Sequence, residues 1–212
     1  MAGVQAATLL MLMLGAPALA GEKPVRLVAL GDSLVAGYGL PAEAAFPAVL
    51  ESALRARGHA VEVINAGVSG DTAAGGLARL DWAVPPEANA VIVELGANDM
   101  LMGIDPKITR KSLAEILRRL RERGVTLLLS GMRASPNLGV DFAREFEAMY
   151  GELATEHNAL LYPFFLDGVA AQAKLNQRDG VHPTAAGVQI LVERILPKVE
   201  ELLARVQQQR RG

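Results

Sequence analysis

The stretch 25-VRLVALGDS-33 decides the fold class, because a short apolar run ends abruptly at a glycine, an aspartate and a serine. Residues 25–30 are almost continuously apolar, which is typical of a parallel strand covered by helices on both faces. The residues that follow, Gly31, Asp32 and Ser33, are too small or too polar to pack a core. A serine at the end of a buried strand therefore needs an explanation other than packing.

Four further apolar runs repeat this pattern along the chain. We expect strands over residues 25–30, 61–65, 90–95, 125–130 and 159–162. Amphipathic segments between and after them predict helices over residues 42–57, 106–123, 141–157 and 183–209. Gly58 and Gly124 follow two of these segments and provide the usual helix stop. The alternation predicts an α/β fold with a parallel sheet and right-handed crossovers.

Length and composition limit the class of protein. The chain has 212 residues, of which 51% are hydrophobic and 21% charged, and its net charge is −2. A chain of this length commonly forms one domain. Without a basic face, and with only 4% aromatic residues for base stacking, we expect no nucleic-acid partner. The absence of cysteine excludes disulfides, thiolate metal sites and a cysteine nucleophile.

The first twenty residues, 1-MAGVQAATLLMLMLGAPALA-20, carry no charged side chain and end in a small-x-small pattern. They predict a secretory signal peptide over residues 1–20, a single domain over residues 21–212, and a periplasmic or secreted location. Because the segment lacks Lys and Arg, an uncleaved membrane anchor is the alternative. Its apolar core is short for a span of about 20 residues, so we expect cleavage and no stable membrane insertion afterwards.

Polar and small residues follow four of the five predicted strands. Ligands of parallel α/β sheets bind beyond the carboxyl ends of the strands, so these residues are the first candidates for a site. They form the segments 31-GDS-33, 65-NAGVSGDT-72, 96-GANDM-100 and 130-SGMRASPN-137. A fifth such segment, 179-DGVHPTAAG-187, follows the last strand after a long loop. Packing alone does not require these residue types.

Three of these residues suit nucleophilic catalysis. Serine is a weak nucleophile without a base, and the base needs a third group that fixes its tautomer. His182 lies three residues after Asp179, a spacing at which both side chains can project the same way. The carboxylate can then accept the Nδ1 proton while Nε2 faces Ser33. We therefore expect Ser33, His182 and Asp179 to act as nucleophile, base and orienting group.

Acyl transfer also needs donors for the oxyanion that forms on the attacked carbonyl. The candidates are the backbone N–H groups of Ser33 and Gly70 and the side-chain amide of Asn98. Glycine suits position 70, because a Cβ would obstruct the approach of the backbone to a substrate. A neutral amide at position 98 can point at developing negative charge.

The chain resembles the SGNH (GDSL) hydrolase superfamily, and it is most similar to the bacterial thioesterase I, lysophospholipase and arylesterase branch. Four blocks match in order and span nearly the whole predicted mature chain: 31-GDSLVAGYGL-40, 65-NAGVSGDT-72, 96-GAND-99 and 179-DGVHP-183. The resemblance assigns the same residues to the triad and the oxyanion hole. It also implies a flavodoxin-like three-layer α/β/α fold with a five-stranded parallel sheet, and no metal or organic cofactor.

The expected activity is hydrolysis of small-molecule carboxylic esters or thioesters of acyl chains. One alternative keeps the triad but acts on O-acetylated carbohydrate. A second is a catalytically silent binding protein on the same scaffold, although neither G-x-G-x-x-G nor G-x-x-x-x-G-K-[ST] is present to bind phosphate. The residues do not determine the oligomeric state, and a monomer is our working expectation.

Substrate contacts are expected first from Met100, Leu101 and Met102, which follow Asn98 directly. Methionine adapts to acyl groups of different shape, and in the similar thioesterase branch this loop contacts the acyl group. The alternative is loop packing against the sheet. Residues 135–139 and 164–170 are candidates for the opposite wall.

Other polar residues near the motifs are expected to be structural. Asp32 should accept N–H groups of its turn, and Asp71 and Asp99 should order loops in the same way. We expect Arg79 to be a solvated or salt-bridged helix residue. Of the remaining aromatic residues, Trp82 is predicted to pack, and His59 and His157 to lie at the surface or in loops.

Overall fold

The computed structural model describes residues 23–211, so the predicted signal peptide over residues 1–20 lies outside the described residues. The described chain contains five strands, β1 (Val25–Gly31), β2 (Val61–Gly67), β3 (Ala90–Glu94), β4 (Thr126–Ser130) and β5 (Leu160–Tyr162). Its α-helices are α1 (Ser33–Ala36), α2 (Phe46–Ala56), α3 (Ala73–Ala78), α4 (Leu80–Ala83), α5 (Ala97–Leu101), α6 (Pro106–Glu122), α7 (Val140–Glu156) and α8 (Ala185–Arg211). Two 3₁₀ turns, Ala42–Ala44 and Pro136–Leu138, complete the set.

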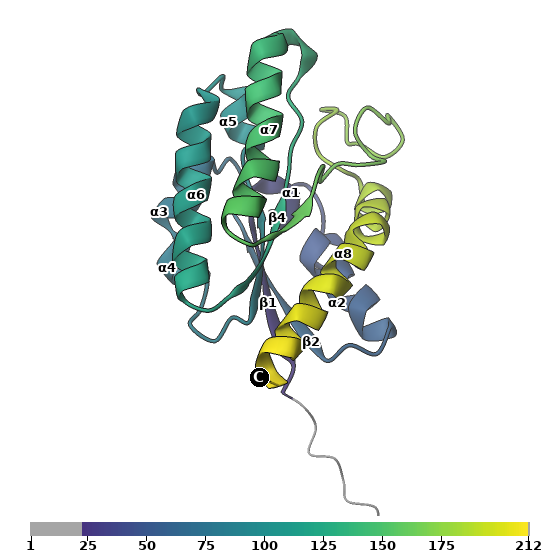
Figure 1. Cartoon of the computed structure of the whole chain (residues 1–212). Helices are drawn as coiled ribbons and strands as arrows, with labels where there is room; N and C mark the ends of the chain where they lie inside the picture. The colour runs from purple at the N-terminus through teal and green to yellow at the C-terminus, as the bar shows by residue number, and fades with distance from the viewer. Residues whose placement is uncertain (1–22, 212) are drawn as a thin grey trace, which may run out of the picture.

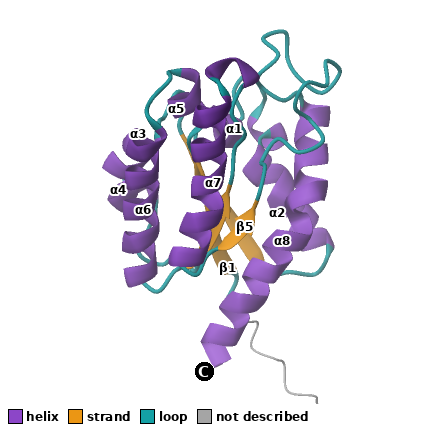
Figure 2. Cartoon of the chain, turned by 45° about the horizontal axis from the view of Figure 1, so that its top comes forward, coloured by secondary structure: helices purple, strands orange, loops and turns teal. Residues whose placement is uncertain are grey.

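The strands form one parallel sheet in the order β2-β1-β3-β4-β5. Helices α6 and α7 cover one face of the sheet, with α3 and α4 beside α6, and helices α2 and α8 cover the other (Figure 1). The turned view in Figure 2 shows the same three layers, with loops gathered at one end of the strands. The predicted three-layer α/β/α fold with a five-stranded parallel sheet is confirmed.

The core follows from the apolar runs. Every residue of the central strands β3 and β4 is buried, as expected for strands with helices on both faces. In α6 the apolar stripe predicted from helical spacing is buried completely, and it consists of Leu113, Ile116, Leu117 and Leu120. Each fully buried leucine or isoleucine contributes roughly 1.5–3 kcal/mol through removal of apolar surface from water.

The sheet ends in a single row of paired residues, Gly67, Gly31, Glu94, Ser130 and Tyr162. The residues just beyond this row therefore meet at one edge, although they are far apart in the sequence. Glycine is required at position 31, because a Cβ there would lie 2.8 Å from the carbonyl oxygen of Glu94. The strand order changes direction between β1 and β3, which is where ligands bind in sheets of this kind.

The short helices α1, α3, α4 and α5 were beyond the reach of periodicity, because each spans fewer than two turns. The predicted helix over residues 42–57 is divided into a 3₁₀ turn and α2, since Ala45 has an extended backbone. The prediction that Trp82 packs was wrong. It is 73% exposed on α4. Within residues 23–211, we find no helix with the length and apolar character that crossing a membrane would require.

Candidate active site

Ser33 is placed by the abrupt change from strand β1 to helix α1. Asp32 caps the helix, and its side chain accepts the Leu34 N–H at 2.9 Å, so the predicted structural role of this carboxylate is confirmed. The cap fixes the first turn of α1 at the sheet edge. Ser33 is consequently nearly buried, at 9% exposure, with its hydroxyl directed toward the loop that follows β5.

The structure brings Ser33, His182 and Asp179 into one hydrogen-bonded chain. His182 Nε2 lies 2.9 Å from Ser33 Oγ, and His182 Nδ1 lies 2.8 Å from Asp179 Oδ2. The other Asp179 oxygen accepts the backbone N–H groups of Val181 and His182 at 2.9 and 3.0 Å. The ring of Tyr38 lies against the imidazole, with centroids 4.5 Å apart. Both ring nitrogens of His182 therefore have a partner.

Asp179 is held in its ionised form. The backbone N–H groups of His182 and Val181, followed by the imidazole, lower the pKa of Asp179 to about 2. A carboxylate that is ionised at neutral pH accepts the Nδ1 proton of His182. That tautomer leaves the Nε2 lone pair facing the Ser33 hydroxyl, which is the arrangement that a general base needs.

The three expected oxyanion donors differ in their surroundings. Neither the Ser33 N–H nor the Gly70 N–H donates to an acceptor in the described part of the chain. Asn98 Nδ2 donates to Asp32 Oδ2 at 3.0 Å and to the Asp71 carbonyl at 2.9 Å, which occupies both amide hydrogens. Gly70 has φ +86°, so its left-handed backbone is a sufficient reason for glycine.

Two buried carboxyls lie beneath the nucleophile turn. Asp32 and Glu94 have no exposed surface. Burial raises the pKa of Asp32 to about 6, and burial together with the charge of Asp32 raises the pKa of Glu94 well above its ordinary value. Glu94 was missed at the level of sequence, although an acidic residue closing the apolar run 90–94 was a usable signal.

Arg79 links the ends of two strands. Its guanidinium pairs with Asp71 and donates to the carbonyls of Ala66 and Gly31 at 2.8 and 2.9 Å. The prediction of a solvated or salt-bridged residue is confirmed by this ion pair, and Arg79 is buried at the junction of α3 and α4. The predicted ordering role of Asp99 is confirmed, since it accepts the Ala73 N–H at 2.8 Å.

A hollow of about 400 Å³ opens beside Ser33, Asn98 and His182. Its walls are mainly apolar and come from α5 and the loops after β4 and β5, with Met100, Leu101, Met132, Pro136, Phe164, Leu166 and Ala170 among them. The lining thus includes Met100 and Leu101, which were predicted in a loop but belong to α5, and parts of both predicted opposite segments. Met102 is outside the lining and 64% exposed, so the structure does not bring this predicted contact into the hollow.

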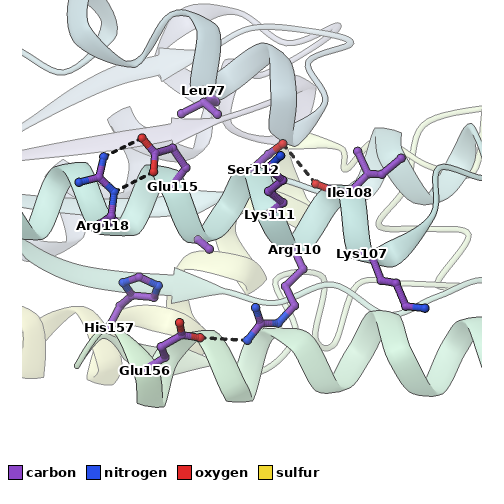
Figure 3. Close-up of a pocket in the computed structure, with 11 residues that line it drawn as sticks. Leu77, Lys107, Ile108, Arg110, Lys111, Ser112, Glu115, Arg118, Glu156 and His157 are labelled. Carbon is purple, nitrogen blue, oxygen red and sulfur yellow. Dashed lines mark hydrogen bonds and ion pairs between the residues drawn. The ribbon is translucent and has the colours of Figure 1, made fainter.

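A second, wider hollow flanks α6 on the outer face of the molecule, and Figure 3 shows its residues. Its arginines pair with carboxylates, Arg118 with Glu115 and Arg110 with Glu156, whereas Lys107 and Lys111 make no ion pair within residues 23–211. His157 lies at its margin and is buried, with 6% of its surface exposed. Neither of its ring nitrogens has a partner among the described residues. The predicted loop position of His157 is confirmed, because it lies in the turn that ends α7, but the residue is buried and not at the surface.

The remaining histidine, His59, lies away from the first hollow. His59 pairs with Glu200 at 3.2 Å. It lies in the loop before β2, as predicted, whereas Ser33 follows the end of β1. Within residues 23–211, no three His, Cys, Asp or Glu side chains lie close enough together to hold a metal ion.

The chain is similar in sequence and fold to several known proteins. The model of the GDSL-like Lipase/Acylhydrolase family matches residues 29–190. Esterase TesA of Pseudomonas aeruginosa is 38% identical over 178 residues, which cover 84% of this chain and 89% of the relative. Thioesterase 1/protease 1/lysophospholipase L1 of Escherichia coli K12 is 39% identical, over 74% of each chain. The crystal structure of AlinE4, an SGNH-hydrolase family esterase, superposes with a TM-score of 0.72 at 47% identity, covering 85% of this chain and 97% of that one.

Proposed function

The chain belongs to the GDSL-like lipase/acylhydrolase family, and on that premise we propose that Ser33, His182 and Asp179 form its catalytic triad. It is a carboxylic ester hydrolase of the esterase, thioesterase and lysophospholipase type, as the names of its relatives indicate. The observation that carries the proposed triad is the unbroken path from Ser33 Oγ through both imidazole nitrogens to Asp179.

In the proposed mechanism His182 takes the Ser33 proton while Oγ attacks the ester carbonyl. Asp179 holds the imidazole and stabilises its positive form without accepting the proton. His182 then returns the proton to the leaving alcohol or thiol, which leaves an acyl group on Ser33. Water, activated by His182, adds to this acyl-enzyme, and the carboxylic acid departs as Ser33 is regenerated.

We propose that the oxyanion is stabilised by the N–H groups of Ser33 and Gly70 and by the Asn98 amide. The free N–H of Ser33 supports this assignment, as does the position of Asn98 in the wall of the same hollow. Asn98 must exchange one present acceptor, Asp32 or the Asp71 carbonyl, for the oxyanion. The remaining bond then keeps the amide aimed at the reacting atom.

We propose acyl chains as the substrate class for this site. The apolar wall formed by Met100, Leu101 and Phe164 can remove a hydrocarbon chain from water, at about 0.8 kcal/mol for each buried CH₂. Such a wall contributes little binding energy for an acetylated sugar, because the sugar hydroxyls need hydrogen-bond partners. Activity restricted to acetate esters would favour the carbohydrate esterase instead.

We also propose that the chain is exported and that residues 21–212 form its single mature domain. The support is the uncharged apolar segment over residues 1–20 and, in the described chain, one sheet with one continuous core. The intact mass of the protein recovered from the periplasm or medium tests this. Retention of residues 1–20 would contradict cleavage.

The central experiment uses a panel of 4-nitrophenyl esters and coenzyme A thioesters with acyl chains from C2 to C12. Wild type and Ser33→Ala are assayed on every member of the panel. We expect the substitution to lower kcat by about 10³-fold or more on every active substrate. The far-ultraviolet circular dichroism of the variant controls for folding. Turnover close to that of the wild type in a folded Ser33→Ala variant would remove the mechanism.

A further inference from the structure

One positive side chain stands at the hollow beside Ser33. Arg133 lies in the loop after β4, lines the hollow and is exposed. Its guanidinium carbon is 4.8 Å from the centroid of the Phe164 ring, which forms part of the same wall. The other charged or titratable members of this lining are Asp32 and His182, and both are already engaged in hydrogen bonds at the catalytic centre.

Arg133 makes no ion pair and no hydrogen bond within the part of the chain that the structure describes, whereas most arginines on the helices are paired. The carboxylate that reaches its loop is Glu147 of α7, and Glu147 accepts the backbone N–H of Ala134 at 3.2 Å. The positive charge at the hollow is therefore left without a negative partner from residues 23–211.

The contact with Phe164 gives this charge a defined position. A cation over an aromatic face is attracted by the ring, and stacking restricts the long arginine side chain without using its N–H donors. A guanidinium held in this way can present two parallel N–H groups to a carboxylate or a phosphate.

We infer that Arg133 is a specificity-determining residue that binds an anionic group, a carboxylate or a phosphate, carried by the ester substrate. The inference rests on the proposed function, because it places that anion in the hollow where the acyl ester would lie. It extends the proposal by requiring that charged esters be preferred over neutral ones of the same length. The anion can lie on the acyl chain or on the leaving group, and the experiment separates these two cases.

The test compares substrates that differ by one charge. For the acyl side, the probes are 4-nitrophenyl hexanoate and the mono-4-nitrophenyl ester of adipic acid. For the leaving-group side, they are the hexanoyl ester of 4-hydroxybenzoate and that of its methyl ester. The readout is the ratio of kcat/KM for the charged probe to that for the neutral probe, in wild type, Arg133→Gln, Arg133→Lys and Arg211→Gln. Arg211 lies at the far end of α8 and changes the net charge equally.

We expect Arg133→Gln to lower this ratio about ten-fold for one of the two probe pairs, mainly through KM, because the guanidinium does not touch the reacting atoms. Arg133→Lys should keep part of the preference for the charged probe, and Arg211→Gln should keep all of it. In the wild type, about 0.5 M salt should reduce this preference. A ratio that is unchanged by Arg133→Gln for both pairs would overturn the inference, as would a fall of the same size in Arg211→Gln.

Failure of the proposed function has a different signature. In that case Ser33→Ala would hydrolyse the neutral probes as fast as the wild type does, whatever residue stands at position 133. A purely structural role of Arg133 in holding Phe164 would lower kcat/KM for the charged and neutral probes alike and would not respond to salt. That outcome would also contradict the inference.

Discussion

The carboxyl edge of the sheet and the outer face of α6 contain the same residue types in different arrangements. Each region has a hollow, a histidine and arginine–carboxylate pairs (Figure 3 shows the α6 face). At the sheet edge, His182 has a hydroxyl on one nitrogen and a carboxylate on the other. On the α6 face, His157 has neither, and burial lowers its pKa. A histidine becomes a base through its two partners and not through its proximity to a hollow.

The ion pairs of the two regions differ in the same way. Arg79 and Asp71 at the sheet edge have side chains only 7% and 17% exposed, and the pair is joined to two strand ends. Arg118 and Glu115 on α6 are 44% and 31% exposed and belong to one helix surface. The buried pair is also hydrogen-bonded to two strand ends and holds the loops that carry the site, whereas the exposed pairs are surrounded by water.

The largest difference is expected between the two histidines. His182→Ala should lower kcat by about 10³-fold or more, because Ser33 loses its base. His157→Ala should keep turnover within about two-fold of the wild type, since that ring faces no nucleophile. The measurement is steady-state hydrolysis of one acyl ester by both variants. Losses of similar size in the two variants would end the distinction between the two hollows.

The two arginines should differ in stability. Arg79→Gln leaves the largely buried Asp71 without its cation and removes one donor from each of two strand-end carbonyls, so we expect the free energy of unfolding to fall by about 3 kcal/mol. Arg118→Gln removes only a solvated contact on α6 and should have a much smaller effect. Urea titrations followed by circular dichroism compare them. If the urea midpoints of both variants match that of the wild type, the linking role of Arg79 is wrong.

Asn98 provides a comparison of polar side chains. Asn98→Ala should lower kcat about 10²-fold with little change in KM, because the amide acts on charge that exists only in the transition state. Ser112, which lines the α6 hollow, provides the matched change, and Ser112→Ala should retain activity. A large rise in KM with kcat intact would show that Asn98 binds the ground state.

The smallest effect concerns the buried carboxyls. Since burial raises the pKa of Glu94 and of Asp32, the folded chain binds their protons more tightly than the unfolded chain does. Their contribution to stability is thus complete below about pH 4. That of Asp32 is lost as the pH rises through about 6, and that of Glu94 as the pH rises through its own raised pKa. Glu94→Gln should remove part of this loss. Between pH 4 and pH 7, the free energy of unfolding of this variant should therefore rise by about 1 kcal/mol or more relative to that of the wild type.

An exposed carboxyl on α6 provides the control for this pH dependence. The neighbouring Arg118 and Arg119 lower the pKa of Glu115 to about 2, so its small contribution has the opposite sign and is lost only in strong acid. Between pH 4 and pH 7, the free energy of unfolding of Glu115→Gln should therefore change with pH in the same way as that of the wild type. Parallel curves for Glu94→Gln as well would show that its carboxyl does not control the stability of the turn.

Most of the fold could be predicted because strand and helix patterns are local. The five apolar runs marked the strands to within about two residues, and the small polar segments after them marked the functional edge. The residues proposed as the triad could be selected because parallel strands bring their carboxyl ends together. The spacing of Asp179 and His182 also needed only three residues of chain.

What could not be predicted depends on contacts between distant segments. The burial of His157 is set by how α7 ends, and the exposure of Trp82 by a helix of one turn. The two acceptors of Asn98 come from other loops, and the stacking of Arg133 on Phe164 joins the loops after β4 and β5. No local pattern encodes such pairs, so composition and periodicity do not reveal them.

The central claim is that Ser33 is the activated nucleophile, and covalent labelling tests it most directly. The protein is treated with a fluorophosphonate, and the modified peptide is identified by mass spectrometry in wild type, His182→Ala and His157→Ala. We predict one adduct, on Ser33, in wild type and His157→Ala, and little or none in His182→Ala. An unlabelled wild type, or an adduct on any residue other than Ser33, would contradict the account.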